Sequence, residues 1–405
     1  MARVAFWCAW LTLGESNFWE YVANYDELFR ADALEYLREP GRYPPSIAVR
    51  RLRTSQSEGC VTEGRLHQFE VDAEMGLTKF ARKIVNSSAA DFTLVPHCLG
   101  NRITRFFEYC RLLPSQKQLS LHKTGCWAFV KDSLEPSLRA WVGEISRRIG
   151  PGAVVVLSLT SSRLFAKALQ GIPFVIGYAG ATNWLARHFP SLSAGVPPDF
   201  GCGTERTRRA TGQSSWMYPH VWPQDVVVQS PSPFDYRTDW RSSAERPFLF
   251  SFVGQNTSCV RNLILRAWGK SVRPDVYVAD TSGSDLSYST VLQRSQYCLV
   301  PDGHVPWTFR FLDVLHHGCV PVVVSESWHP PLHRILHWTD AQFPVLFVHP
   351  ARVRGLHERL AMEEPATWSA MQRQTAALAA ALDMRSDVFY ELQLAELVLA
   401  VRDRP

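Results

Sequence analysis

The sequence predicts an α/β protein with two domains, each built around a parallel β-sheet. Two observations favour this fold class. Short apolar runs that are typical of buried strands alternate with stretches of helical periodicity along most of the chain. The chain is also long enough to form two hydrophobic cores, because it has 405 residues, of which 46% are hydrophobic and 20% charged.

The first half of the chain contains the elements of one such sheet. Helical spacing of apolar residues predicts helices over 15–38, 66–85, 102–113 and 161–169. Apolar runs predict strands over 90–96, 154–159, 174–178 and 222–228. Turn-forming composition predicts loops over 39–66 and 191–213 and a proline-containing linker over 230–246. We therefore expect an N-terminal domain over residues 1–235.

A second domain is expected over residues 247–385. Its first elements are a strand over 247–254, a helix over 258–268, a strand over 276–279 and a helix over 286–294. Two helical stretches, 356–382 and 387–401, end the chain. We expect residues 386–405 to form a separate C-terminal helix.

Residues 295–338 give the strongest functional signal, because they predict a strand–helix–strand unit. The strands are the apolar runs 297–300 and 320–324, and the helix between them covers 309–317. Gly318 is placed to end that helix in a left-handed conformation. This order of elements is typical of a parallel sheet.

Glycines and polar residues gather at the carboxyl ends of these two strands. Gly303 follows the first strand, Thr308 can cap the helix, Arg310 lies near the start of the helix, and Glu326 follows the second strand. Open α/β sheets bind ligands at the carboxyl edge of their strands. The sequence therefore predicts a ligand site here.

This block resembles the exostosin family of glycosyltransferases. The matching residues are Cys298-Leu299, Pro301, Gly303, Thr308, Arg310-Phe311-Leu312-Asp313, Gly318-Cys319-Val320-Pro321-Val322, Pro331 and Trp338. The resemblance is strong over 247–340 and partial at 88–97 and 222–231. It implies a GT-B fold, in which two Rossmann-like domains enclose a ligand cleft and the C-terminal helix packs back on the first domain. It also implies an inverting transfer of a sugar from a nucleotide diphosphate to a glycan.

The resemblance and the charge of such a donor together indicate a donor site. A nucleotide-diphosphate leaving group gains negative charge, which helix N-termini and arginines stabilise without a metal. Arg310 is our main candidate for this role, and its alternative is an ion pair with Asp313 or a surface carboxylate. Arg261, in the helix after Gly254, is a second candidate, and its alternative is a surface arginine. The sequence has no Asp-x-Asp motif, so we expect no metal and no other cofactor.

Other residues of the block are assigned to the same site. Glu326 is expected to bind hydroxyls of the ribose or sugar, and the alternative is a carboxylate that caps the helix near His333. Gly254 and Gly303 either allow backbone to approach phosphate or form tight turns. Thr308 belongs to the donor site, and Asp313 is expected to orient Arg310 rather than to catalyse.

An inverting transfer also needs a general base, normally from the first domain. The candidates are Asp91, His97, Glu108, His220 and Asp225. We assign the base to His97, which follows a predicted strand, with a polar loop residue as the alternative. One difference from the family motif bears on catalytic activity. His333 stands where the family commonly has an acidic residue.

The amino-acid composition limits the classes of binding partner. The net charge is +5, and no basic run is interleaved with aromatic residues, so the sequence argues against nucleic-acid binding. The expected partners are a sugar nucleotide, a glycan or glycoprotein acceptor, and a homo- or hetero-oligomer with another glycosyltransferase. The resemblance favours a UDP-linked donor and glucuronosyl transfer, with other sugars left open. The alternative function is a non-catalytic exostosin-like subunit that binds glycan or a partner enzyme.

The resemblance implies the Golgi or secretory pathway, but the N-terminus carries no clear targeting signal. Its apolar run, residues 4–13, is too short to cross a bilayer and has no basic flank or cleavage signal. The chain has nine cysteines without metal-binding spacing. We expect Cys298 and Cys319 to be packed thiols, and one disulfide among Cys98, Cys110 and Cys126.

Overall fold

The computed structural model describes residues 21–38, 48–51, 83–84, 92–95, 125–148, 154–159, 174–177, 184–196, 200, 202, 226–227, 245–303, 308–383 and 386–402. The chain forms two compact units. Unit 1 comprises Met1–Leu34, Gly180–Tyr218 and Gln229–Leu392, and unit 2 comprises Glu35–Ala179, Pro219–Val228 and Gln393–Pro405. Each unit contains one sheet in which all strand pairs are parallel, which confirms the predicted α/β class with two parallel sheets. The exact domain bounds stay predictions.

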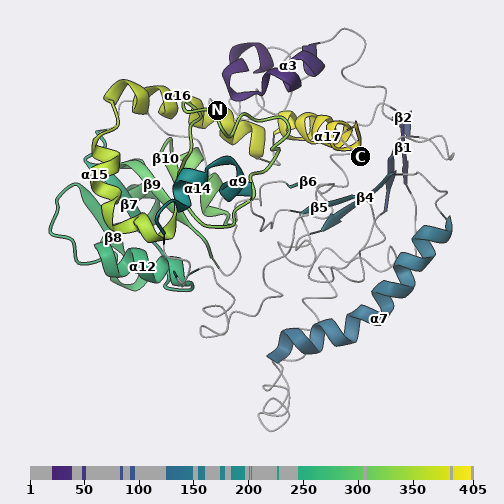
Figure 1. Ribbon diagram of the computed structural model, residues 1–405, viewed down its shortest axis with the longest axis horizontal. Coiled ribbons are helices and arrows are strands. Elements are labelled where there is room, and N and C mark those ends of the chain that lie inside the picture. Colours follow the sequence, from purple (N-terminus) through teal and green to yellow (C-terminus); the bar gives the residue numbers. More distant parts are fainter. Residues whose placement is uncertain are drawn as a thin grey trace, which may run out of the picture. The chain divides into compact units, whose positions relative to one another are not determined.

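Unit 1 holds a five-stranded sheet in the order β11-β10-β9-β7-β8 (Figure 1). Its strands are β7 (Phe248–Val253), β8 (Val276–Ala279), β9 (Ser295–Pro301), β10 (Val320–Val324) and β11 (Leu346–Val348). All five residues of β10 are buried, as expected for a strand that is covered on both faces. Val324 pairs with Pro301, so β9 and β10 end side by side at the carboxyl edge.

Unit 1 also contains helices and short helical turns. They are α9 (Trp184–His188), α10 (Pro190–Ser193), α12 (Cys259–Trp268), α13 (Tyr288–Gln293), α14 (Arg310–His316), α15 (Leu356–Ala361) and α16 (Pro365–Leu382), with the 3-10 turns η1 (Asp26–Leu28), η3 (Thr281–Gly283) and η4 (Pro350–Gly355). α12 packs against β8, and α14 packs against β10 and α16. Two further helices, α3 (Ala31–Arg38) and α17 (Asp387–Arg402), each begin in unit 1 and end in unit 2.

The end of α14 follows the prediction from Gly318. This glycine has a φ of 62°, in the left-handed region. Its N–H donates to the Leu315 carbonyl at 3.0 Å, and the Cys319 N–H donates to the Val314 carbonyl at 3.2 Å. These two bonds form a Schellman motif, which turns the chain directly from α14 into β10.

Among the residues that the structure describes, unit 1 has two disulfides, and one of them corrects a prediction. Cys298 in β9 is bonded to Cys319, and Cys202 is bonded to Cys259. The expectation of packed thiols at 298 and 319 was wrong, because Cys298 pairs with Pro321 in the sheet and Cys319 lies two residues before that proline. Residues two apart in a strand share a face. The predicted pairing among Cys98, Cys110 and Cys126 concerns side chains outside the described part.

Unit 2 holds a six-stranded sheet in the order β2-β1-β3-β4-β5-β6. Its strands are β1 (Ala48–Arg51), β2 (Lys83–Ile84), β3 (Phe92–Leu94), β4 (Val154–Leu159), β5 (Phe174–Gly177) and β6 (Val226–Val227). β1 lies where we predicted a loop, and β2 lies where we predicted a helix. Both strands contain charged residues, so no apolar run marks them, and they are defined by pairing with each other and with β3.

A long helix, α7 (Gly125–Arg148), also belongs to unit 2. It carries two ion pairs at helical spacing, Arg139–Glu135 at 2.7 Å and Arg148–Glu144 at 2.9 Å. The predicted helices over 102–113 and 161–169 lie outside the described residues. In the part of the chain that the structure describes, none of the helices has the length and apolar character needed to span a membrane.

Candidate functional site

The carboxyl edge of the unit 1 sheet brings together most of the predicted donor-site residues. Gly254 follows β7, Gly303 follows β9 and Glu326 follows β10, and these three strands are neighbours. Adjacent strands lie about 5 Å apart, so the segments after β7 and β10 start roughly 10 Å from each other. The Ser258 hydroxyl, which caps α12, donates to the Asp302 carbonyl at 2.8 Å and thereby joins two of these segments.

Arg310 is the first residue of α14, and its side chain is buried against aromatic rings. The residue is only 8% exposed. Its Cζ lies 4.8 Å from the centre of the Phe252 ring and 4.9 Å from that of Tyr288. One Nη2–H donates to the Val253 carbonyl, while the buried Nε has no hydrogen-bond partner. A buried donor without a partner costs free energy, which a bound anion would recover.

The ion pair between Arg310 and Asp313 that we considered as an alternative is not formed. Asp313 Oδ2 instead accepts a hydrogen bond from the Tyr288 hydroxyl at 3.1 Å. Among the residues that the structure describes, no carboxylate forms an ion pair with Arg310. The guanidinium therefore keeps its charge while being held by rings and a carbonyl.

Gly254 lies directly against this arginine. A Cβ on Gly254 would come within 2.7 Å of Arg310 Nη2 and 3.0 Å of Phe252 Cζ. Real Cβ atoms do not make such contacts, so a side chain here would displace the guanidinium. The predicted approach of backbone to phosphate at Gly254 stays a prediction, and the structure shows that this glycine leaves room for Arg310.

Arg261 of α12 lies close enough to Arg310 for the two charges to interact. Its Nη1 donates to Thr257 Oγ1 at 3.0 Å and to the Gln255 carbonyl at 3.4 Å, whereas its buried Nε has no partner. Burial, and then the positive charge of Arg310, lowers the pKa of Arg261 to about 10. Two neighbouring, partly desolvated cations form an environment that favours a ligand with more than one negative charge.

Thr308 supports the first turn of the same helix. Its Oγ1 accepts a hydrogen bond from the Arg310 N–H at 3.2 Å, and the residue is buried. The predicted capping contact is therefore present, although Phe309, not Thr308, is the residue directly before the helix. Gly303 is buried next to this turn.

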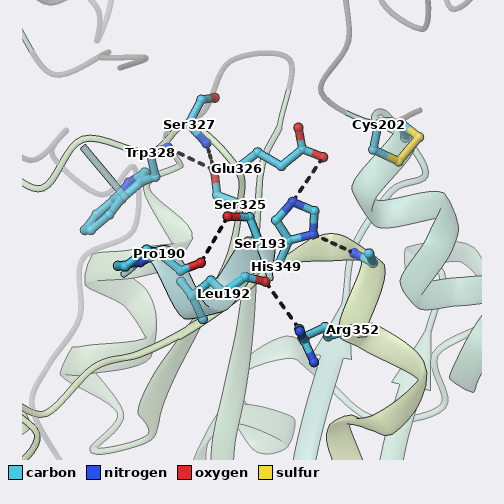
Figure 2. Close-up of polar contacts among 12 residues, drawn as sticks. Pro190, Leu192, Ser193, Cys202, Ser325, Glu326, Ser327, Trp328, His349 and Arg352 are labelled. Atoms are coloured by element: carbon cyan, nitrogen blue, oxygen red, sulfur yellow. Dashed lines mark hydrogen bonds and ion pairs between the residues drawn. A yellow bond between two sulfur atoms is a disulfide. The ribbon is translucent and has the colours of Figure 1, made fainter. Parts of the chain in front are cut away.

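Glu326 has a different neighbour from the one that we considered. Figure 2 shows its carboxylate pointing toward His349, with 3.8 Å between Oε1 and Nε2. His349 Nδ1 accepts a hydrogen bond from the Ala351 N–H at 3.2 Å, so the ring proton lies on Nε2 and faces Glu326. Burial, and then Arg352, lowers the pKa of His349, which favours this neutral form.

The surroundings of His349 are fixed by residues from several elements. Arg352 of η4 donates to the carbonyl of Leu192 at 3.2 Å (Figure 2) and to that of Ala194 at 2.5 Å. The Phe200 ring centre lies 5.5 Å from that of His349. These contacts fix the segment after β11, which places His349 beside the Glu326 carboxylate.

His333, the departure from the family pattern, lies beside another histidine in the loop after β10. Nδ1 of His333 is 3.1 Å from Nε2 of His329. Burial lowers the pKa of His329 to about 3, with a further effect of Arg334, and burial also lowers the pKa of His333 well below its usual value. This loop therefore contains neutral imidazoles.

The structure groups the predicted residues unevenly. Arg261, Arg310, Gly254 and Thr308 lie together, and Gly303 and Glu326 share their sheet edge. The general-base candidates Asp91, His97, Glu108, His220 and Asp225 all lie outside the described residues. Sequence reasoning missed three residues that shape the site: Phe252, Tyr288 and His349. Within the described ranges, no group of three or more His, Cys, Asp or Glu side chains could hold a metal, and metal independence stays a prediction.

Comparisons with known proteins connect this geometry to a family. Residues 199–362 match the Exostosin GT47 domain. A probable glycosyltransferase of Arabidopsis thaliana is 30% identical over 93 residues, which cover 23% of this chain and 20% of that protein. An Exostosin-1 homolog of Caenorhabditis elegans is 45% identical over 58 residues, 14% of this chain and 15% of that protein.

Solved structures align with most of this chain only at low similarity. A trehalose 6-phosphate synthase of Burkholderia multivorans aligns with 88% of this chain and 98% of its own, at 10% identity and a TM-score of 0.35. A TM-score this low carries no argument about fold or function. The family match is local: residues 199–362 include β7, β9, α14 and β10 with Arg261, Arg310 and Glu326. The chain spans a fifth or less of the length of these curated relatives, and the similarity to exostosin glycosyltransferases is therefore a property of residues 199–362.

Proposed function

We propose that the protein is an inverting, metal-independent glycosyltransferase that moves a sugar from a nucleotide diphosphate to a glycan acceptor. UDP is the proposed nucleotide and glucuronic acid the proposed sugar. The observation that carries the proposal is the pair Arg261 and Arg310, which lie near each other at the starts of two helices, each with a buried Nε that lacks a partner. A diphosphate is the ligand whose charge and donor requirements fit this pair.

The chemistry follows from the charge that develops on the leaving group. As the glycosidic bond of the donor breaks, negative charge grows on the terminal phosphate oxygen. Arg310 and Arg261 stabilise this charge, together with the dipoles of the helices that carry them. Removal of one such preorganised donor typically lowers the rate by about 10²–10³-fold. The arginines thereby perform the task that a divalent metal performs elsewhere.

Glu326 has a separate role in this proposal. Its carboxylate accepts hydrogen bonds from the ribose or sugar hydroxyls, while the His349 Nε2–H faces Oε1 at 3.8 Å, beyond hydrogen-bond distance. His97 removes the proton of the acceptor hydroxyl as the general base. We further propose that the protein acts in the Golgi or secretory pathway, on a glycoprotein or glycan, in an oligomer with itself or with another glycosyltransferase.

Thermal stabilisation by nucleotides tests the donor site. UDP or a UDP-sugar that binds only the folded state should add about 2.7 kcal/mol at 100 times its Kd. We expect this stabilisation in the natural protein and its loss in Arg310→Ala. Arg294→Ala is the matched control, because Arg294 also lies over an aromatic ring, 5.2 Å from the centre of Phe248, but is exposed. The absence of stabilisation by any nucleotide in a folded sample would contradict the proposal.

The rival function is a non-catalytic subunit that binds glycan or a partner enzyme. The observation that favours it is His333, which stands where the family commonly has an acid and lies beside His329 as a neutral ring. Binding of a UDP-sugar without turnover of any glycan acceptor would support this rival. Measured transfer would exclude it.

A further inference from the structure

Tyr288 contacts both Arg310 and the acidic residue that could neutralise it. Its ring centre lies 4.9 Å from Arg310 Cζ, and its hydroxyl donates to Asp313 Oδ2 at 3.1 Å. Tyr288 is the first residue of α13, which packs against β7 and β9, so its ring is held by a different part of the chain from α14.

The contact with Asp313 matters because of its position on the helix. Asp313 follows Arg310 by three residues, and oppositely charged residues at this spacing are neighbours on a helix face that can form an ion pair. Such a pair would neutralise Arg310 and occupy its donors. In this structure Asp313 bonds to Tyr288, and Arg310 retains an unpartnered Nε.

We propose that Tyr288 is a positioning residue that holds the Asp313 carboxylate away from Arg310 and so keeps the arginine charge available for the donor diphosphate. This inference rests on the proposed glycosyltransferase function. The ring and the hydroxyl of Tyr288 both keep the charge of Arg310 available. The ring supports the guanidinium without neutralising it, and the hydroxyl holds the competing anion.

The direction of the hydrogen bond is stable. Burial raises the pKa of Tyr288, and the nearby Arg310 opposes this rise only in part. The hydroxyl therefore stays protonated across the physiological pH range and donates to the carboxylate. A tyrosine that lost this proton would repel Asp313 toward Arg310.

Tyr288→Phe isolates the role of the hydroxyl, because it keeps the ring under Arg310. We expect UDP to bind about tenfold more weakly, since loss of the hydroxyl's hydrogen bond loosens the Asp313 carboxylate, which then competes with the diphosphate for Arg310. Affinity for uridine, which has no phosphate, should not change. Tyr288→Phe combined with Asp313→Asn should bind UDP as the natural protein does, because the competing charge is gone. Both affinities are measured by titration calorimetry on the full chain.

Tyr277→Phe is the matched control, since Tyr277 also donates to an aspartate, Asp285, away from the site. It should leave UDP affinity unchanged. The inference is overturned if Tyr288→Phe binds UDP normally, or if the double variant binds as weakly as Tyr288→Phe, which would show a purely structural role. If the natural protein itself does not bind UDP, the proposed donor and the inference both fall, whereas normal binding with an unaffected Tyr288→Phe rejects the inference alone.

Discussion

The two edges of the unit 1 sheet each bury an arginine, and they use it differently. Arg246 lies before β7, at the amino edge, and Arg310 lies in α14, at the carboxyl edge; each is 8% exposed. Arg246 donates to three carbonyls, of Leu292 at 3.1 Å, Ser295 at 2.6 Å and His317 at 2.7 Å. Arg310 donates to the Val253 carbonyl and otherwise faces two rings.

This difference shows that burial alone does not identify a functional arginine. Arg246 satisfies carbonyls from α13, β9 and the end of α14, so its charge is used to join these segments. The Arg310 guanidinium is held mainly by aromatic faces, which leave hydrogen-bonding capacity for a ligand. The groups that accept hydrogen bonds from each guanidinium, rather than its exposure, distinguish the structural role of Arg246 from the binding role that we propose for Arg310.

Arg246→Met should remove the hydrogen bonds that join segments at the amino edge, and we expect it to have the largest effect on stability. It removes a hydrogen bond from three carbonyls, of which that of Leu292 still accepts from the Arg294 N–H. Each buried polar group that loses its partner costs about 1–3 kcal/mol, so we expect a loss of about 2 kcal/mol or more. Urea unfolding measures this change. Arg310→Met is the matched variant at the other edge, and it should cost less stability while abolishing UDP binding. Equal losses of stability in the two variants would contradict the comparison.

The sequence predicted the carboxyl edge well because local signals agree there with the final fold. β7, β8, α12 and β10 were expected within a few residues of their observed bounds. Ser258 caps α12 and Gly318 ends α14, and both residue types mark helix ends in any sequence. The donor-site residues follow these elements directly, so their common edge could be inferred.

The features that the sequence did not predict depend on contacts between distant segments of the chain. Strand β1 contains charged residues and is defined by its pairing with β2 and β3. The disulfide between Cys298 and Cys319 requires the register of β9 against β10. Tyr288 reaches Arg310 only after β9 and α14 have packed, and no local pattern encodes that approach. The partner of Glu326 was missed because β11, which places His349, was not predicted.

Gly254→Ala should disturb the carboxyl edge without affecting the amino edge. Its Cβ would meet Arg310 Nη2 at 2.7 Å and Phe252 Cζ at 3.0 Å, so the guanidinium must move. Overpacking of this kind typically costs about 1–3 kcal/mol, and we expect most of it to appear as weaker UDP binding. Titration with UDP checks this expectation. Gly283→Ala is the matched control, because a Cβ there meets no atom within 4 Å. Unchanged UDP affinity in Gly254→Ala would argue against a fixed position for Arg310.

The histidines after β10 make the stability of the folded protein depend on pH. The pKa of His329 is about 3 in the folded protein, against 6.5 when exposed. Below pH 6.5 the unfolded chain therefore binds a proton that the folded protein does not, and stability falls as the pH falls from 6.5 toward 3. The slope from His329 is about 1.4 kcal/mol per pH unit.

His329→Gln removes this contribution and should flatten the decline measured by urea unfolding between pH 6.5 and 5. His337→Gln is the control, since His337 is a partly exposed histidine near the same loop. A decline that is equally steep in His329→Gln would show that the folded protein accepts the proton at this position. In that case the loop after β10 would carry positive charge at mildly acidic pH. The carboxyl edge would then attract anions through this loop as well as through Arg261 and Arg310.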